Sequence, residues 1–139
     1  MSLFNVFDIS ATGMSAQSVR LNTTASNIAN ADSVSSSVDK TYRARQPVFA
    51  AQLQKAATGQ EQSVGVDVLG IVESNKPLIM QYSPNHPMAN KDGYIFKPNV
   101  NIIEEMTNMI SASRSYQTNV QLAESAKSMV NKTLLLGQR

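Results

Sequence analysis

Apolar residues recur at intervals of seven near the start of the chain. The repeat runs through Phe7, Met14, Leu21 and Ile28, and Phe4 lies half a repeat earlier. An average spacing of 3.5 residues is typical of a helix that packs one face against another helix. The pattern therefore predicts a long helix over residues 4–30.

The last segment repeats this pattern. Asn101 followed by Glu104 is typical of a capping box at a helix start, and Gly137 is placed as a C-terminal cap. These signals predict a second long helix over residues 102–136. Its apolar positions are Ile102, Met109, Tyr116, Ala123 and Val130, with Met106, Val120 and Leu134 beside them.

The middle of the chain has a different pattern. All five prolines fall between positions 47 and 98, and proline disrupts a helix interior, so long helices are expected only at the two ends. Residues 31–40 are rich in Ser and predict a linker, and Asn90 to Gly93 predicts a turn. Alternating or β-branched runs predict four short strands, over residues 42–51, 63–73, 78–82 and 94–97.

The expected architecture is α+β, with two long terminal helices and a small β-rich insert. We expect the N-terminal helix within residues 1–33, the linker and insert within 34–98, and the C-terminal helix within 99–139. An insert of this size is too small to bury a large core by itself.

Composition adds an unusual feature to this picture. The 139 residues include 47 Ser, Thr, Asn and Gln but only 22 charged residues, and only three charges fall in the first 38 positions. A helix exposed to water usually carries a charged outer face, whereas these helices carry small uncharged side chains. We therefore expect a subunit of a densely packed assembly, with the N-terminal helix the more completely enclosed of the two.

Several chemistries are excluded or disfavoured by the same inventory. The chain has no Cys and one histidine, His86, so thiol chemistry and multi-histidine metal sites are excluded. Glu104 and Glu105 are adjacent and point to different sides of a helix, which disfavours an acid–base pair. No apolar run approaches the length of a membrane span. We expect no enzyme activity, no cofactor or metal and no small-molecule substrate.

One basic and aromatic cluster is present, formed by Lys40, Tyr42, Arg43 and Arg45. On a strand, Arg43 and Arg45 share a face, which makes phosphate binding conceivable. The net charge of +2 without further basic clusters favours a solvated or interfacial strand face, and no nucleic-acid partner is expected.

Two stretches resemble a known family. Residues 13–33 are similar to the signature of bacterial flagellar rod and hook proteins, and residues 93–106 are similar to its proximal-rod members. The first stretch is centred on Ser26, Asn27, Ile28, Ala29 and Asn30, and the second carries Gly93, Tyr94, Pro98, Asn99 and Val100.

This resemblance implies a structural subunit of the rod, the drive shaft that transmits torque from the motor to the hook. It implies terminal helices packed as an antiparallel coiled coil in the inner layer of a tube, with the β-rich part outside. The implied partners are other copies, other rod proteins, the basal-body adaptor at the membrane ring and the type III export apparatus. Location in the periplasm, reached without a cleaved signal peptide, is also implied. We assign the subunit interface to the apolar repeats of the two helices.

Two other functions remain as alternatives. A soluble chaperone or adaptor would use its amphipathic helices to bind one partner helix, and its helices would carry charged outer faces. An enzyme would depend on His86, which lies between Pro84 and Pro87.

Overall fold

The computed structural model describes residues 3–55 and 61–137. It confirms an α+β chain with two long terminal helices, whose ends lie within one residue of the predicted ones. The first strand begins at Arg45, three residues later than predicted, and the Ser-rich linker runs into a short 3₁₀ turn. In chain order the elements are α1 (Leu3–Ala29), η1 (Val38–Lys40), β1 (Arg45–Lys55), β2 (Glu61–Glu73), β3 (Ile79–Tyr82), β4 (Tyr94–Lys97) and α2 (Ile102–Gly137).

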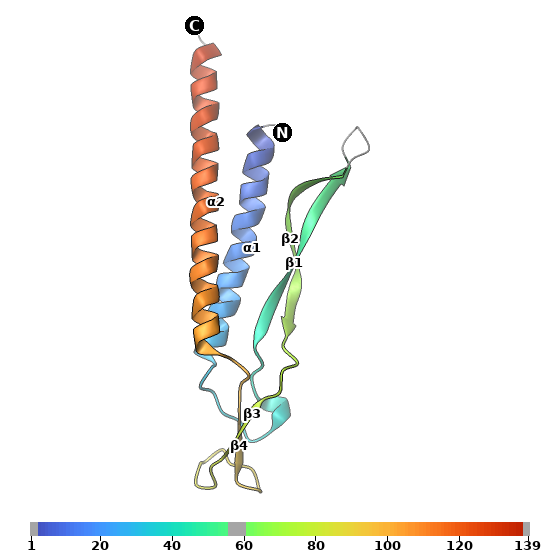
Figure 1. Ribbon diagram of the computed structural model, residues 1–139, viewed down its shortest axis with the longest axis vertical. Helices are drawn as coiled ribbons and strands as arrows, with labels where there is room; N and C mark the ends of the chain where they lie inside the picture. The colour runs from blue at the N-terminus through green and yellow to red at the C-terminus, as the bar shows by residue number, and fades with distance from the viewer. Residues whose placement is uncertain (1–2, 56–60, 138–139) are drawn as a thin grey trace.

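Helices α1 and α2 lie side by side and run in opposite directions (Figure 1). Arg20 in α1 donates a hydrogen bond to Oδ1 of Asn108 in α2, at 3.1 Å. Gly13, two turns earlier in α1, faces Asn119, about three turns later in α2. Helix α2 is nine residues longer than α1, and its C-terminal end extends past the start of α1 (Figure 1).

Small side chains dominate the buried positions of both helices. A Cβ placed on Gly13 would lie only 2.8 Å from Nδ2 of Asn119, so the two helices approach closely there. Small residues permit this approach because little side-chain volume separates the two backbones. The buried small residues of the helices are Ser10, Ala16, Thr23 and Thr24 in α1 and Ala112 and Ala126 in α2, and Gly13 is half-buried.

Strands β1 and β2 form a long antiparallel hairpin that follows α1 on the side away from α2 (Figure 1). Its register runs from Arg45 opposite Glu73 to Lys55 opposite Glu61, with two irregularities along β1. The hairpin contacts α1 where the backbone N–H of Val66 donates to Oγ1 of Thr12, at 3.2 Å. Helix α1 therefore has α2 on one side and the hairpin on the other.

Strands β3 and β4 form a second, shorter ribbon at the end of the molecule opposite both termini (Figure 1). Tyr82 pairs with Tyr94 at its end, and their rings meet edge to face with centroids 5.2 Å apart. The predicted turn closes where Gly93, with a φ of 80°, donates its N–H to the carbonyl of Asn90. Ser35 exchanges two backbone hydrogen bonds with Phe96 and so joins the linker to this ribbon.

Candidate functional site

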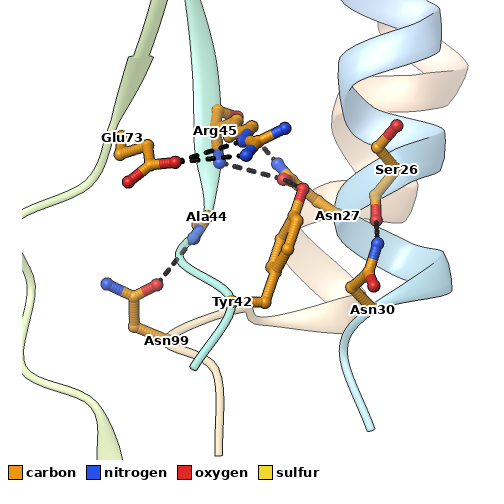
Figure 2. A network of polar contacts seen from close by, with 8 residues as sticks. All are labelled: Ser26, Asn27, Asn30, Tyr42, Ala44, Arg45, Glu73 and Asn99. Atoms are coloured by element: carbon orange, nitrogen blue, oxygen red, sulfur yellow. Dashed lines mark hydrogen bonds and ion pairs between the residues drawn. The ribbon is translucent and has the colours of Figure 1, made fainter. Parts of the chain in front are cut away.

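Asn27 lies at the junction between the helix pair and the long hairpin, near the C-terminal end of α1 (Figure 2). Its side chain is only 1% exposed and uses all of its hydrogen-bonding capacity. Oδ1 accepts from the Tyr42 hydroxyl and from the backbone N–H of Arg45, both at 2.9 Å. Nδ2 donates to the carbonyl of Arg45 at 2.8 Å and to Oε2 of Glu105 at 3.1 Å. One amide therefore connects α1, α2 and the first residue of β1.

Tyr42 and Arg45 complete this side of the junction (Figure 2). The guanidinium of Arg45 lies over the Tyr42 ring, 5.4 Å from its centroid, and pairs with Glu73 at 3.2 Å. Burial raises the pKa of the Tyr42 phenol above its usual value near 10, and the positive charge of Arg45 partly opposes that rise. Tyr42 thus remains a hydrogen-bond donor to Asn27 throughout the neutral range.

Two further asparagines of the recognised stretches bind backbone near this junction (Figure 2). Asn30 donates from Nδ2 to the carbonyl of Ser26 at 2.8 Å, and its backbone N–H donates to the same carbonyl at 3.2 Å, so Asn30 binds the last turn of α1 twice. Asn99 accepts the N–H of Ala44 at 2.8 Å and donates to the carbonyls of Ser74 and Lys76. Asn99 therefore holds both strands of the hairpin at its root.

The remaining residues of the recognised stretches are placed as follows. Pro98 is fully buried and Gly93 is buried, whereas Tyr94, Ser26 and Ala29 are exposed. Ile28 and Val100 are half-buried. The recognised stretches thus contribute internal contacts as well as surface positions.

The residues assigned from the apolar repeats lie on the outer and half-buried parts of the helix pair. Ile102, Met106, Tyr116 and Leu134 are exposed, with Leu134 at 62%. The side chain of Phe4 lies outside the described residues. The half-buried members are Phe7, Met14, Leu21, Ile28, Met109, Val120, Ala123 and Val130. None of these side chains belongs to the fully buried set between the elements, and their role as a subunit interface stays a prediction.

Helix α2 also exposes large apolar side chains that the sequence analysis missed. Ile103 is 78% exposed and Leu136 is 76% exposed, and Ile110, Leu122, Met129 and Leu135 are exposed as well. Counting in steps of seven from Ile102 passes over these positions, although large apolar residues outside the repeat were visible in the sequence. Exposed apolar surface of this extent marks a contact surface more often than a solvated one.

The other candidate residues form no reactive cluster. His86 uses Nδ1 to accept the N–H of Met88 at 3.1 Å, so the ring supports the turn. Arg43 precedes β1 and donates to the carbonyl of Ser74. The prediction that Arg43 and Arg45 share a strand face is therefore wrong.

A polar hollow of about 490 Å³ adjoins the junction and is lined by Tyr42, Arg43 and Arg45 among others. Within residues 3–55 and 61–137 no group of three or more His, Asp or Glu could hold a metal ion.

No described helix is both long enough and apolar enough to cross a membrane. Taken together, the described residues form a narrow helical scaffold with apolar outer positions and a tightly bonded polar junction. This arrangement is typical of an assembly subunit.

Family models match both ends of the chain. Residues 7–35 match the family described as flagella basal body rod protein. Residues 91–136 match the family described as flagellar basal body rod FlgEFG protein C-terminal. The two matched regions contain most of α1 and almost all of α2, which places the chain in the class of flagellar rod proteins.

Full-length relatives narrow this class. The flagellar basal-body rod protein FlgC of Salmonella typhimurium (strain LT2) is 48% identical over 138 residues, which cover 99% of this chain and all of the relative. FlgC of Escherichia coli O157:H7 is 48% identical over 139 residues, and FlgC of Buchnera aphidicola subsp. Acyrthosiphon pisum is 44% identical over 140, with the same coverage. Similarity of this level over the whole length shows that the chain belongs to the FlgC family of flagellar basal-body rod proteins.

Proposed function

We propose that the chain is a structural subunit of the proximal rod of the bacterial flagellum, part of the drive shaft that carries torque from motor to hook. The observation that carries this proposal is the placement of the large apolar side chains. The buried positions of the helices are mostly Ala, Ser and Thr, while Ile103, Met106 and Leu134 remain on the surface. A rod needs such surface because each subunit must contact several neighbours. The role involves no catalytic step.

The axial part of the subunit comprises residues 1–33 and 99–139, and residues 34–98 lie outside it. We propose that α1 and α2 form an antiparallel coiled coil, with their repeats available to neighbouring subunits. The opposite directions of the two helices and the Arg20–Asn108 bond support this arrangement. Torque passes through helix packing, because each helix contacts neighbours along much of its length.

The partners follow from this role. They are further copies of the chain, other proximal and distal rod subunits, and the adaptor that joins the rod to the membrane ring. Delivery is by the flagellar type III export apparatus, to a rod in the periplasm. The FlgC relatives support this location through their named role in the basal body.

The test uses Leu134→Asp, because this side chain is 62% exposed and its replacement does not disturb the single chain. We expect an unchanged far-UV circular dichroism spectrum, no rods in purified basal bodies by electron microscopy, and no swimming. The physical reason is that assembly would bury an unpaired charge. Asn131→Asp, an exposed change nearby in α2, is the matched control and should swim normally. Normal rods in the Leu134→Asp strain would contradict the proposed interface.

A folded Leu134→Asp chain that fails only to bind one soluble partner, in a 1:1 complex, would favour the adaptor alternative. Size-exclusion chromatography with light scattering measures that stoichiometry. Assembly of the unaltered chain into filaments of many copies would support the rod role.

A further inference from the structure

The Asn27 side chain does more than fill a buried position. Its amide accepts the N–H and donates to the carbonyl of the same residue, Arg45. A neighbouring β-strand satisfies a residue in the same way, by exchanging both backbone hydrogen bonds. Arg45 begins β1 and is paired with Glu73 of β2 on its other edge. Asn27 thus acts as a one-residue third strand at the root of the hairpin.

Asn99 binds the adjoining part of this root. It accepts the N–H of Ala44 and donates to the carbonyls of Ser74 and Lys76, which follow β2. Ala44 and Ser74 are themselves joined by a backbone hydrogen bond of 2.7 Å. The two asparagines come from the C-terminal end of α1 and from the segment that leads into α2. Together they connect both strands of the hairpin to both helices.

Farther along, the hairpin still contacts α1, where Gly65 and Val66 lie against Thr12. The hydrogen bond from Val66 to Thr12, at 3.2 Å, is longer than the two bonds between Asn27 and Arg45, at 2.8 and 2.9 Å. Leu53, Leu69 and Ile71 are all exposed. A two-stranded ribbon with little buried apolar surface is only marginally stable by itself. We therefore expect the bonds at its root to contribute more to its direction than the single hydrogen bond to Thr12 does.

We propose that Asn27 and Asn99 form an amide clamp that fixes the direction of the β1–β2 hairpin relative to the α1–α2 pair. Both are positioning residues, because they act through the backbone of residues 44, 45, 74 and 76. This inference goes beyond the rod role and does not depend on it, since the isolated chain displays the geometry. Asn27 and Asn99 both lie in the stretches that resemble the family, and in this proposal they make contacts inside one subunit.

The chain has no cysteine, so spin labels can be attached at chosen introduced cysteines. One pair, Ala51→Cys with Gln121→Cys, reports the distance from hairpin to α2. A second pair, Ser18→Cys with Gln121→Cys, reports the distance between the helices. All three positions are exposed. Pulsed electron paramagnetic resonance then gives the distance distribution of each pair in the full chain.

We expect Asn27→Ala and Asn99→Ala to broaden the hairpin-to-helix distribution and to leave the helix-to-helix distribution unchanged. Amide exchange at Arg45 in Asn27→Ala should rise about tenfold, as expected for loss of one or two ordinary hydrogen bonds. Asn22→Ala, an exposed asparagine on α1, is the matched control and should change neither measurement.

Three results would overturn the clamp. One is a hairpin distribution that stays as narrow as in the unaltered chain. A second is equal broadening of both distributions, which would make the asparagines general stabilisers. The third is broadening in Thr12→Val but not in the asparagine variants, which would assign the direction of the hairpin to the Thr12 contact. If Asn27→Ala does not fold, Asn99→Asp tests the clamp by the same distance measurements. Asn99 is only half-buried, and Asp keeps the acceptor for Ala44 but loses the donor to Ser74 and Lys76.

Discussion

The close approach of α1 and α2 at Gly13 allows a quantitative test of how the helices are paired. Replacing a helix-interior glycine with alanine normally stabilises a protein by about 1 kcal/mol. Here the new Cβ would lie 2.8 Å from Nδ2 and 3.2 Å from Cγ of Asn119, closer than ordinary contact allows. The Asn119 side chain would have to leave its preferred rotamer, which costs about 0.5–1.5 kcal/mol. We therefore expect Gly13→Ala alone to change the free energy of unfolding by close to zero.

Removing the Asn119 side chain should allow Gly13→Ala to stabilise the protein as it would in an unobstructed helix. In the Asn119→Ala background, Gly13→Ala should stabilise by about 1 kcal/mol, because the space beside the new Cβ is then free. The coupling between the two substitutions is thus about 1 kcal/mol, measured by urea unfolding of all four chains followed by circular dichroism. The protein concentration is kept low enough to prevent assembly.

Ser15→Ala is the matched control for helix propensity, because Ser15 is exposed in the same turn region of α1. Its effect should be the same with and without Asn119→Ala. If Gly13→Ala alone gave its full stabilisation, and the two substitutions were additive, the close approach of residues 13 and 119 would be refuted. The antiparallel pairing of α1 and α2 in this register would then be wrong.

Three further predictions concern the junction, the turn and the helix start. Desolvation raises the Tyr42 pKa in the folded chain, so the contribution of this shift to stability is complete below about pH 10 and is lost as the pH rises through the folded-state pKa. Tyr42→Phe should therefore lose less stability than the unaltered chain as the pH rises above about 10, measured by urea unfolding at each pH. Gly93→Ala should destabilise the protein by at least about 1 kcal/mol, because φ is 80° and the new Cβ would lie 2.9 Å from the Tyr82 ring. Thermal unfolding at equal protein concentration measures this loss. An unchanged midpoint would contradict the strained geometry. Asn101→Ala should lower the free energy of unfolding by about 1 kcal/mol, because Oδ1 of Asn101 accepts the N–H groups of Ile103 and Glu104 at the start of α2. The control is Asn75→Ala, an exposed loop change, which should leave the stability unaltered.

The long helices could be predicted from the sequence because their signals are local. Apolar residues at intervals of seven, the absence of proline and the Asn101 cap all act within a few residues of the backbone they order. The strands could be placed approximately for the same reason, although β1 begins only at Arg45. In the segment just before it, Tyr42 donates to Asn27 and the N–H of Ala44 donates to Asn99, and no pattern within residues 42–44 indicates these contacts.

The buried side of the helix pair could not be predicted in the same way. Periodicity identifies large apolar side chains, and it does not tell whether they pack inside one chain or between chains. In this structure the buried positions belong mostly to small residues such as Ala16 and Ala112. The role of Asn27 was hidden for a different reason. Its partners Tyr42, Arg45 and Glu105 lie 15, 18 and 78 positions away, so only the folded chain brings them together.

The low charge of α1 acquires a physical explanation from its neighbours. In a single chain α1 is already covered by α2 on one side and by the β1–β2 hairpin on the other (Figure 1). A charged side chain on either covered face would be desolvated without a partner, which is costly. Only the remaining face is available to other subunits, whereas α2 exposes most of its circumference and carries large apolar side chains there. We therefore expect α1 to be the more completely enclosed helix in a rod, and α2 to supply most of the new apolar contact area on assembly.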